Sequence, residues 1–332
     1  MGCKITKIAT YLPEKVLTNT ELEQASARLS AAKIEKKVGI RERHIAGAHE
    51  TSLDMAYHAS LNVLSGYDKD KIDFVILCTQ SPDYFLPTSA SMLQNKLGLR
   101  TNIGAFDMNL GCSGYIYGLA CAKSFIAANL ASTVLVVTSE TYSKFIHEKD
   151  YANRTIFGDG ATATIIEKAD NEAIFQFVLG TDGSGWDKLI VPNGGMRNAY
   201  DPLAPQLEDD SGNCRTNNHI YMNGPEIFNF TIEAVPPLIE ETLLKNQMEK
   251  ENIDYFIFHQ ANKYMIEYLQ KKIKIPDEKF YKDMLHVGNT VSSTIPIALK
   301  ESLDKGLVKT GNKVLLCGFG VGYSWGAVII EI

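Results

Sequence analysis

Cys112 stands between two glycines in an otherwise apolar run, FDMNLGCSGYIYGLACA at residues 106–122. A free cysteine commonly packs as a small buried hydrophobe, so the two glycines are the informative feature. Gly111 and Gly114 fit a sharp turn from a strand into a helix, with close approach of the backbone. A thiol at such a helix start faces unpaired amides and the positive end of the helix dipole, which are expected to lower its pKa. Cys112 is therefore either a packing residue or a nucleophile.

His259 and Asn289 are two further polar residues at comparable positions. His259 follows an apolar strand in FIFHQAN, and Asn289 lies between a glycine and a helix start rich in small residues in HVGNTVSSTIPIAL. Taken singly, each has an ordinary structural explanation, as a hydrogen-bonded histidine and a turn asparagine. Ligands in α/β folds collect at the carboxyl ends of strands. Three polar residues at such ends therefore predict a common site.

The elements that must position these residues alternate between short apolar strands and helical patterns. This alternation predicts an α/β architecture with buried strands. The expected strands include residues 71–79, 103–109 and 133–140, and the expected helices include 88–98 and 113–130. The polar stretch 193–218, rich in Gly, Pro, Asn and Asp, is expected to form a long surface loop or flap.

The pattern of strands occurs twice along the chain. IDFVIL at 72–77 resembles IDYFIF at 253–258, VLVV at 134–137 resembles VLLC at 314–317, and GDGATATIIEK at 158–168 corresponds to GYSWGAVIIEI at 322–332. In this comparison Asn289 takes the place of Cys112. We interpret the chain as two fused copies of one βα unit, residues 1–175 with the cysteine and 176–332 with the histidine and asparagine.

Composition excludes several classes of function. The 332 residues carry a net charge of -6, which argues against a broad surface for nucleic acid or anionic membranes. The six cysteines form no CxxC pair and are too sparse for a disulfide framework, so a reducing cytoplasm is expected. No apolar run approaches the roughly 18 residues that span a bilayer, and the first residues predict a strand and a turn instead of a leader.

Six motifs together resemble those of the β-ketoacyl-acyl carrier protein synthase III group of thiolase-fold condensing enzymes. They stand in the family's order and span nearly the whole chain: GIRERH at 39–44, LGCSGYIYGL at 110–119, FGDGA at 157–161, HQAN at 259–262, HVGNT at 286–290 and GFGVGYSWG at 318–326. The resemblance implies a thiolase-like fold with two duplicated βα halves in five layers, α-β-α-β-α. It also implies a homodimer.

The resemblance implies Cys112 as the nucleophile, completed by His259 and Asn289, in a ping-pong decarboxylative Claisen condensation. The thiolate would attack an acyl thioester and form an acyl-enzyme. Malonyl-acyl carrier protein would then lose carbon dioxide, leaving an enolate whose oxygen needs hydrogen-bond donors. His259 Nε2 and the Asn289 amide can supply them. The resemblance implies no bound cofactor or metal.

The same resemblance assigns an oxyanion hole to the backbone amides of Cys112 and Val321. Gly320 and Gly322 would permit the turn that aims the Val321 amide. Phe319 corresponds to the family's aromatic residue beside the cysteine and histidine, although a core residue at a strand end would look the same.

The loop QSPDYFLPTSA at 80–90 resembles the family loop that closes the acyl pocket of the partner subunit, with Phe85 or Leu86 as its gate. An ordinary loop that packs on its own subunit is the alternative. Either residue would favour short acyl chains.

Carrier binding is the part of the resemblance from which this sequence departs. Asn262 corresponds to the residue that positions the thioester arm, and Lys37, Arg154 and Lys263 are candidates for contacts with the carrier. The family commonly has a tryptophan before GIRERH, but ARLSAAKIEKK has no aromatic residue, and Tyr264 replaces a basic residue after HQAN. The primer acyl group can therefore arrive as acyl-CoA or on an acyl carrier protein.

Two other functions remain open on sequence grounds. An acyltransferase on the same fold would hand the acyl group on Cys112 to an alcohol or amine without decarboxylation. A non-enzymatic subunit of a condensing heterodimer would usually lack a catalytic residue, whereas this chain keeps all three.

Overall fold

The computed structural model describes residues 2–332, whose two large β-sheets are stacked between helices. The first sheet has the strand order β1-β7-β6-β4-β5, and the second has the order β13-β14-β15-β8. The strands of the first sheet are β1 (Gly2–Tyr11), β4 (Phe74–Cys78), β5 (Gly104–Met108), β6 (Thr133–Glu140) and β7 (Gly160–Ala169). Those of the second are β8 (Val178–Thr181), β13 (Tyr255–Phe258), β14 (Lys313–Gly320) and β15 (Ser324–Glu331).

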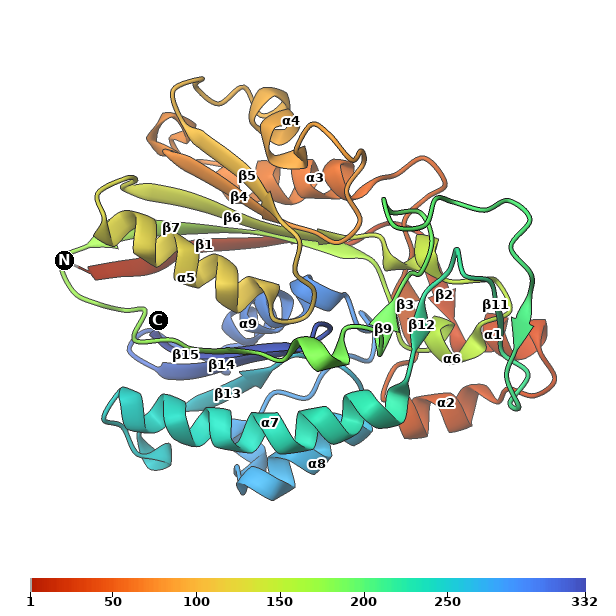
Figure 1. Cartoon of the computed structure of the whole chain (residues 1–332). Coiled ribbons are helices and arrows are strands. Elements are labelled where there is room, and N and C mark those ends of the chain that lie inside the picture. Colours follow the sequence, from red (N-terminus) through yellow and green to blue (C-terminus); the bar gives the residue numbers. More distant parts are fainter. Residues whose placement is uncertain (1) are drawn as a thin grey trace.

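The helices make the remaining three layers of a five-layered α-β-α-β-α arrangement (Figure 1). Helices α3 (Ser52–Leu64) and α4 (Ser89–Lys96) cover the outer face of the first sheet, and α7 (Gly224–Lys245) and α8 (Lys263–Ile273) lie on the outer side of the second. Helices α5 (Gly114–Ala127) and α9 (Thr294–Asp304) are sandwiched between the sheets and contact both. A separate apolar core fills each of the three interfaces. The expected thiolase-like fold is confirmed.

The two sheets repeat the same pairing, as the sequence duplication predicts. In the first sheet β4 pairs in parallel with β6, which pairs antiparallel with β7. In the second, β13 pairs in parallel with β14, which pairs antiparallel with β15. The second sheet lacks a full counterpart of β5. At the corresponding edge, next to β13, it has only an isolated parallel bridge between Phe256 and Phe280. The division of the chain into domains near residue 175 stays a prediction.

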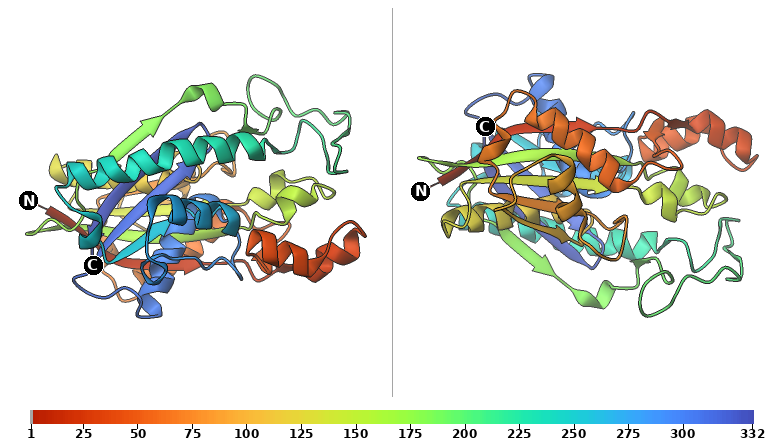
Figure 2. Two further views of the ribbon diagram at one scale, coloured as in Figure 1. Left: turned by 90° about the horizontal axis from the view of Figure 1, so that it is seen from below. Right: turned by 90° about the horizontal axis from the view of Figure 1, so that it is seen from above.

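Short elements gather at one end of the molecule, away from the two termini (Figures 1 and 2). They are β2 (Val16–Thr18), α1 (Asn19–Ala25), α2 (Ala31–Val38), β3 (Glu42–His44), α6 (Tyr151–Arg154), β9 (Leu189–Ile190), β10 (Leu207–Glu208), β11 (Cys214–Arg215) and β12 (Tyr221–Met222). The flap at 193–218 is largely irregular and contains the short β10–β11 hairpin. Within residues 2–332, none of the helices combines the length and the apolar character that a membrane crossing requires.

Candidate active site

Cys112 lies in the tight turn between β5 and α5, as its flanking glycines predict. The Gly114 N–H donates to the carbonyl of Gly111 (2.8 Å) and closes the turn around the cysteine. The end of β14 approaches the same turn from the other half of the chain. A side chain on Gly320 would place its Cβ 2.8 Å from Cβ and 3.0 Å from Sγ of Cys112. Glycine is therefore required at 320 because the nucleophile candidate occupies the space that a side chain would need.

His259 follows the last residue of β13 directly, and its backbone N–H donates to the carbonyl of Cys317 (2.8 Å). Its imidazole is buried, with Nδ1 at 2.7 Å from the Thr294 hydroxyl. The ring of Phe319 meets the imidazole edge to face, at 5.6 Å between centroids and 82° between planes. Burial lowers the pKa of His259 to about 3, so the imidazole is neutral near pH 7.

Asn289 is fixed by backbone hydrogen bonds to the first half of the chain. Its N–H donates to the carbonyl of Ile156, and its carbonyl accepts from the N–H of Gly158, both at 3.0 Å. The side-chain oxygen accepts from the N–H of Val291 (2.9 Å), which turns the amide nitrogen the other way. That nitrogen makes only a long 3.5 Å contact with the carbonyl of Ala261, so it retains donor capacity.

One cavity of about 160 Å³ brings Cys112, His259 and Asn289 together. The structure thus brings together residues that are far apart in the sequence, since Cys112 lies 147 positions before His259 and Asn289 lies further on still. The predicted Asn262 lines the same cavity, and its side chain caps α8 by accepting from the N–H of Met265 (2.9 Å). The remaining wall is mainly apolar and includes Phe157, Leu189, Met222, Ile227, Met265 and Phe319.

The backbone amides assigned to the oxyanion hole are available as donors. Among residues 2–332, neither the N–H of Cys112 nor that of Val321 donates to another residue. Val321 lines the cavity in the turn that joins β14 to β15. In this turn Gly322 has φ of +140°, a value that other residues rarely adopt. Unpaired backbone N–H groups of this kind stabilise a negative oxygen in other enzymes that transfer acyl groups.

The expected lowering of the Cys112 pKa is wrong. Burial raises the pKa of the thiol to about 12, and a neighbouring carboxyl group, Glu140, acts in the same direction. Cys112 lies two positions before Gly114, the first residue of α5, and only its own backbone N–H stabilises the thiolate. Because burial also raises the pKa of Glu140 to about 8, this carboxyl group is mostly neutral at pH 7. Burial is the larger of the two causes that raise the Cys112 pKa.

Glu140 itself is a buried residue near the site that sequence reasoning missed. Its carboxyl group accepts from the N–H of Gln80 (3.1 Å) and from the hydroxyls of Ser81 (3.1 Å) and Ser292 (3.0 Å). These contacts tie the end of β6 to the loop after β4 and to the segment after Asn289. An acidic residue at the end of the apolar run TVLVVTSE was the available signal.

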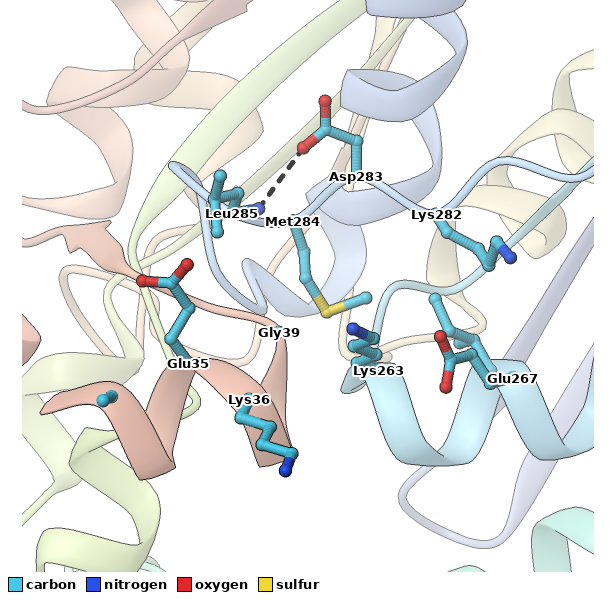
Figure 3. A pocket seen from close by; sticks show the side chains of 11 residues that line it. Glu35, Lys36, Gly39, Lys263, Glu267, Lys282, Asp283, Met284 and Leu285 are labelled. Carbon is cyan, nitrogen blue, oxygen red and sulfur yellow. Dashed lines mark hydrogen bonds between the residues drawn. The ribbon is translucent and has the colours of Figure 1, made fainter. Parts of the chain in front are cut away.

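The predicted carrier contacts lie outside this cavity. Lys263 lines an open basin of about 610 Å³ between α2 and α8, where Figure 3 shows it with Lys36, Glu35 and Glu267. The basin is lined by acidic and basic side chains, and neither Cys112 nor His259 belongs to its lining. Lys37 is exposed on α2.

Arg154 lines a separate hollow of about 230 Å³, which shares Phe157 with the cavity, and it donates to the carbonyl of Glu148. Phe85 and Leu86 are 76% and 80% exposed and do not line the cavity of their own chain.

Two duplicated halves in five layers, with a cysteine, a histidine and an asparagine meeting at strand ends, define a thiolase-fold condensing enzyme. Comparison with known proteins narrows the class. Residues 106–183 match the family model of 3-oxoacyl-[acyl-carrier-protein (ACP)] synthase III, and residues 243–332 match the model of its C-terminal part. The chain belongs to the β-ketoacyl-[acyl-carrier-protein] synthase III family.

Similar proteins match along their whole length. The chain is 35% identical over 333 residues to the β-ketoacyl-[acyl-carrier-protein] synthase III of Streptococcus equi subsp. equi, covering 99% of each chain. It resembles a crystal structure of 3-oxoacyl-(acyl-carrier-protein) synthase III with 47% identity and a TM-score of 0.98, covering all of both chains. The corresponding enzyme of Pseudomonas aeruginosa PAO1 gives 30% identity and a TM-score of 0.86, covering 100% of this chain and 98% of the other.

Proposed function

We propose that this enzyme joins an acyl group held on Cys112 to a malonyl unit carried by acyl carrier protein, releasing carbon dioxide and a β-ketoacyl product. The observation that carries the proposal is the single cavity lined by Cys112, His259 and Asn289. A thiol nucleophile forms the acyl-enzyme, and two neutral side-chain donors suit an enolate oxygen. Membership of the synthase III family supports the same reaction.

In the first half-reaction, Cys112 Sγ forms a bond to the acyl carbon and the carrier's sulfur leaves, taking up a proton. The backbone N–H groups of Cys112 and Val321 stabilise the oxygen that becomes negative on the way. The thioester reaches the sulfur through the cavity, past Asn262. The primer carrier is coenzyme A or an acyl carrier protein.

In the second half-reaction, the bond between the malonyl carboxylate and its α-carbon breaks, and the electron pair forms an enolate. His259 and Asn289 stabilise the enolate oxygen, and the α-carbon then attacks the acyl group. The carbon–carbon bond forms as Cys112 leaves as a thiolate, which is protonated from water. The neutral state of His259 suits this role, because a donor is needed and not a strong base.

The two half-reactions can be tested separately with single variants. Cys112→Ala is expected to form no covalent acyl adduct, whereas His259→Ala forms the adduct but releases no carbon dioxide from malonyl carrier protein. Cys121→Ala, which replaces the cysteine within the following helix α5, is the matched control and should leave both steps unchanged. A wild-type level of adduct on Cys112→Ala would refute the nucleophile assignment.

We also propose a homodimer in which the loop at 80–90 closes the partner's acyl pocket. Two observations support it. Strand β5 pairs on one side only, with β4, and leaves its other edge open. Phe85 and Leu86 expose large apolar side chains that do not line their own cavity.

We further propose that the enzyme works in a reducing compartment such as the cytoplasm. All six cysteines are unpaired, which supports this proposal.

A further inference from the structure

Thr294 is the only group among residues 2–332 within hydrogen-bond distance of the His259 ring, with its hydroxyl 2.7 Å from Nδ1. It is the first residue of α9 and is 3% exposed. Neutral imidazole has one N–H and one bare nitrogen, and the partner of one nitrogen decides which form is present. Thr294 therefore governs whether Nε2 enters the cavity as a donor or as an acceptor.

The Thr294 hydroxyl has one proton and two acceptors within reach. Nδ1 of His259 lies at 2.7 Å, and the carbonyl of Val291 lies at 3.1 Å. The second distance is long for an O–H···O bond, which normally spans about 2.5–3.0 Å. The Val291 carbonyl already accepts the backbone N–H of Thr294, whereas Nδ1 has no other partner. We infer that the Thr294 hydroxyl donates to Nδ1 and holds His259 in the tautomer that carries its proton on Nε2.

This tautomer makes His259 a neutral hydrogen-bond donor. A carboxylate beside Nδ1 would accept its proton and leave Nε2 bare, but no carboxylate contacts the ring within residues 2–332. With Nε2–H and the amide nitrogen of Asn289, the cavity offers two donors to the enolate oxygen. Thr294 is thus a positioning residue for the decarboxylative half-reaction, an inference that rests on the proposed function.

The inference predicts that loss of the hydroxyl affects one half-reaction and spares the other. Thr294→Val keeps the shape but removes the donor, so malonyl decarboxylation should fall about 10²-fold, the usual cost of losing one oxyanion donor. Acylation of Cys112 should stay within about twofold, since that oxyanion is held by backbone amides. Thr294→Ser should restore decarboxylation to near the wild-type rate.

Thr242→Val is the matched control, because Thr242 is also a buried helical threonine whose hydroxyl bonds a backbone carbonyl, that of Leu238 (2.7 Å). It should change neither half-reaction. Equal losses of acylation and decarboxylation in Thr294→Val would indicate a merely structural role and overturn the inference.

The tautomer can be observed directly in the wild-type enzyme, whether or not the valine variant folds. We would record ¹⁵N NMR spectra of the imidazole groups and assign His259 by its disappearance in His259→Asn. A proton on Nε2 is expected, and a proton on Nδ1 would overturn the inference. The latter result would leave the proposed function standing, because that function is judged by the acyl-enzyme and the β-ketoacyl product.

Discussion

The contact between Gly320 and Cys112 yields the sharpest quantitative prediction, for Gly320→Ala. The added methyl carbon would lie 2.8 Å from the Cys112 Cβ, whereas carbon atoms in contact lie about 3.5–4.0 Å apart. The difference requires a displacement of about 0.7–1.2 Å, shared between the end of β14 and the cysteine turn. A displacement near 1 Å at a reacting group can cost about 10² in rate. Overpacking should also cost about 1–3 kcal/mol of stability.

Acyl-enzyme formation on Gly320→Ala should therefore slow about 10²-fold, as followed by intact-protein mass spectrometry over time. Gly183→Ala is the matched control, since a Cβ at Gly183 meets nothing within 4 Å. This control should acylate at the wild-type rate with an unchanged melting temperature. Acylation of Gly320→Ala within twofold of wild type would refute the claim that glycine at 320 sets the position of the sulfur.

Three further predictions concern the histidine, the asparagine and the subunit interface. Burial lowers the pKa of His259 from 6.5 to about 3, so as the pH falls the unfolded chain takes up a proton before the folded protein does. The contribution of the neutral histidine to the free energy of unfolding is therefore fully present above pH 6.5 and declines below it. Between pH 7 and pH 4.5 the free energy of unfolding, measured in urea, should fall by about 2–3 kcal/mol more for the wild type than for His259→Asn. Equal losses would contradict the neutral histidine. Asn289→Ala should reduce condensation about 10²- to 10³-fold with acylation retained. Asn289→Asp keeps the acceptor for the N–H of Val291 but turns a negative oxygen toward the enolate, so it should condense no better than the alanine variant; higher activity would remove Asn289 as a donor. Size-exclusion chromatography should give about twice 36.7 kDa, and a mass near 36.7 kDa would refute the dimer.

The sequence predicts the strand pattern well because buried strands leave a local signal. IDFVIL covers all of β4 except its last residue, IDYFIF contains β13, and the repeat of such segments predicts the two similar sheets. The same logic predicts Cys112, His259 and Asn289 as site residues, since each follows a strand or precedes a helix, and the fold brings them into one cavity. The incomplete edge at Phe280 was not predicted, because a single bridge leaves no alternating pattern to read.

What could not be predicted depends on contacts between the two halves. The position of Cys112 before a helix predicts a lowered pKa, but the pKa is raised because packed neighbours bury the thiol. That burial is a tertiary effect that the local sequence does not reveal. Thr294 looked like one of several small residues at a helix start, and only the fold brings its hydroxyl to His259. Lys37 and Arg154 lie outside the cavity, and their contacts with the carrier stay a prediction.

The most direct test of the proposed condensation is intact-protein mass spectrometry of the enzyme and of malonyl-acyl carrier protein after incubation with acyl-CoA and acyl-carrier primers. A β-ketoacyl mass on the carrier protein, with a transient acyl mass on the enzyme, is the expected result and identifies the primer. An acyl-enzyme that persists while the malonyl carrier stays unchanged with every primer would contradict condensation and favour transfer to an alcohol or amine.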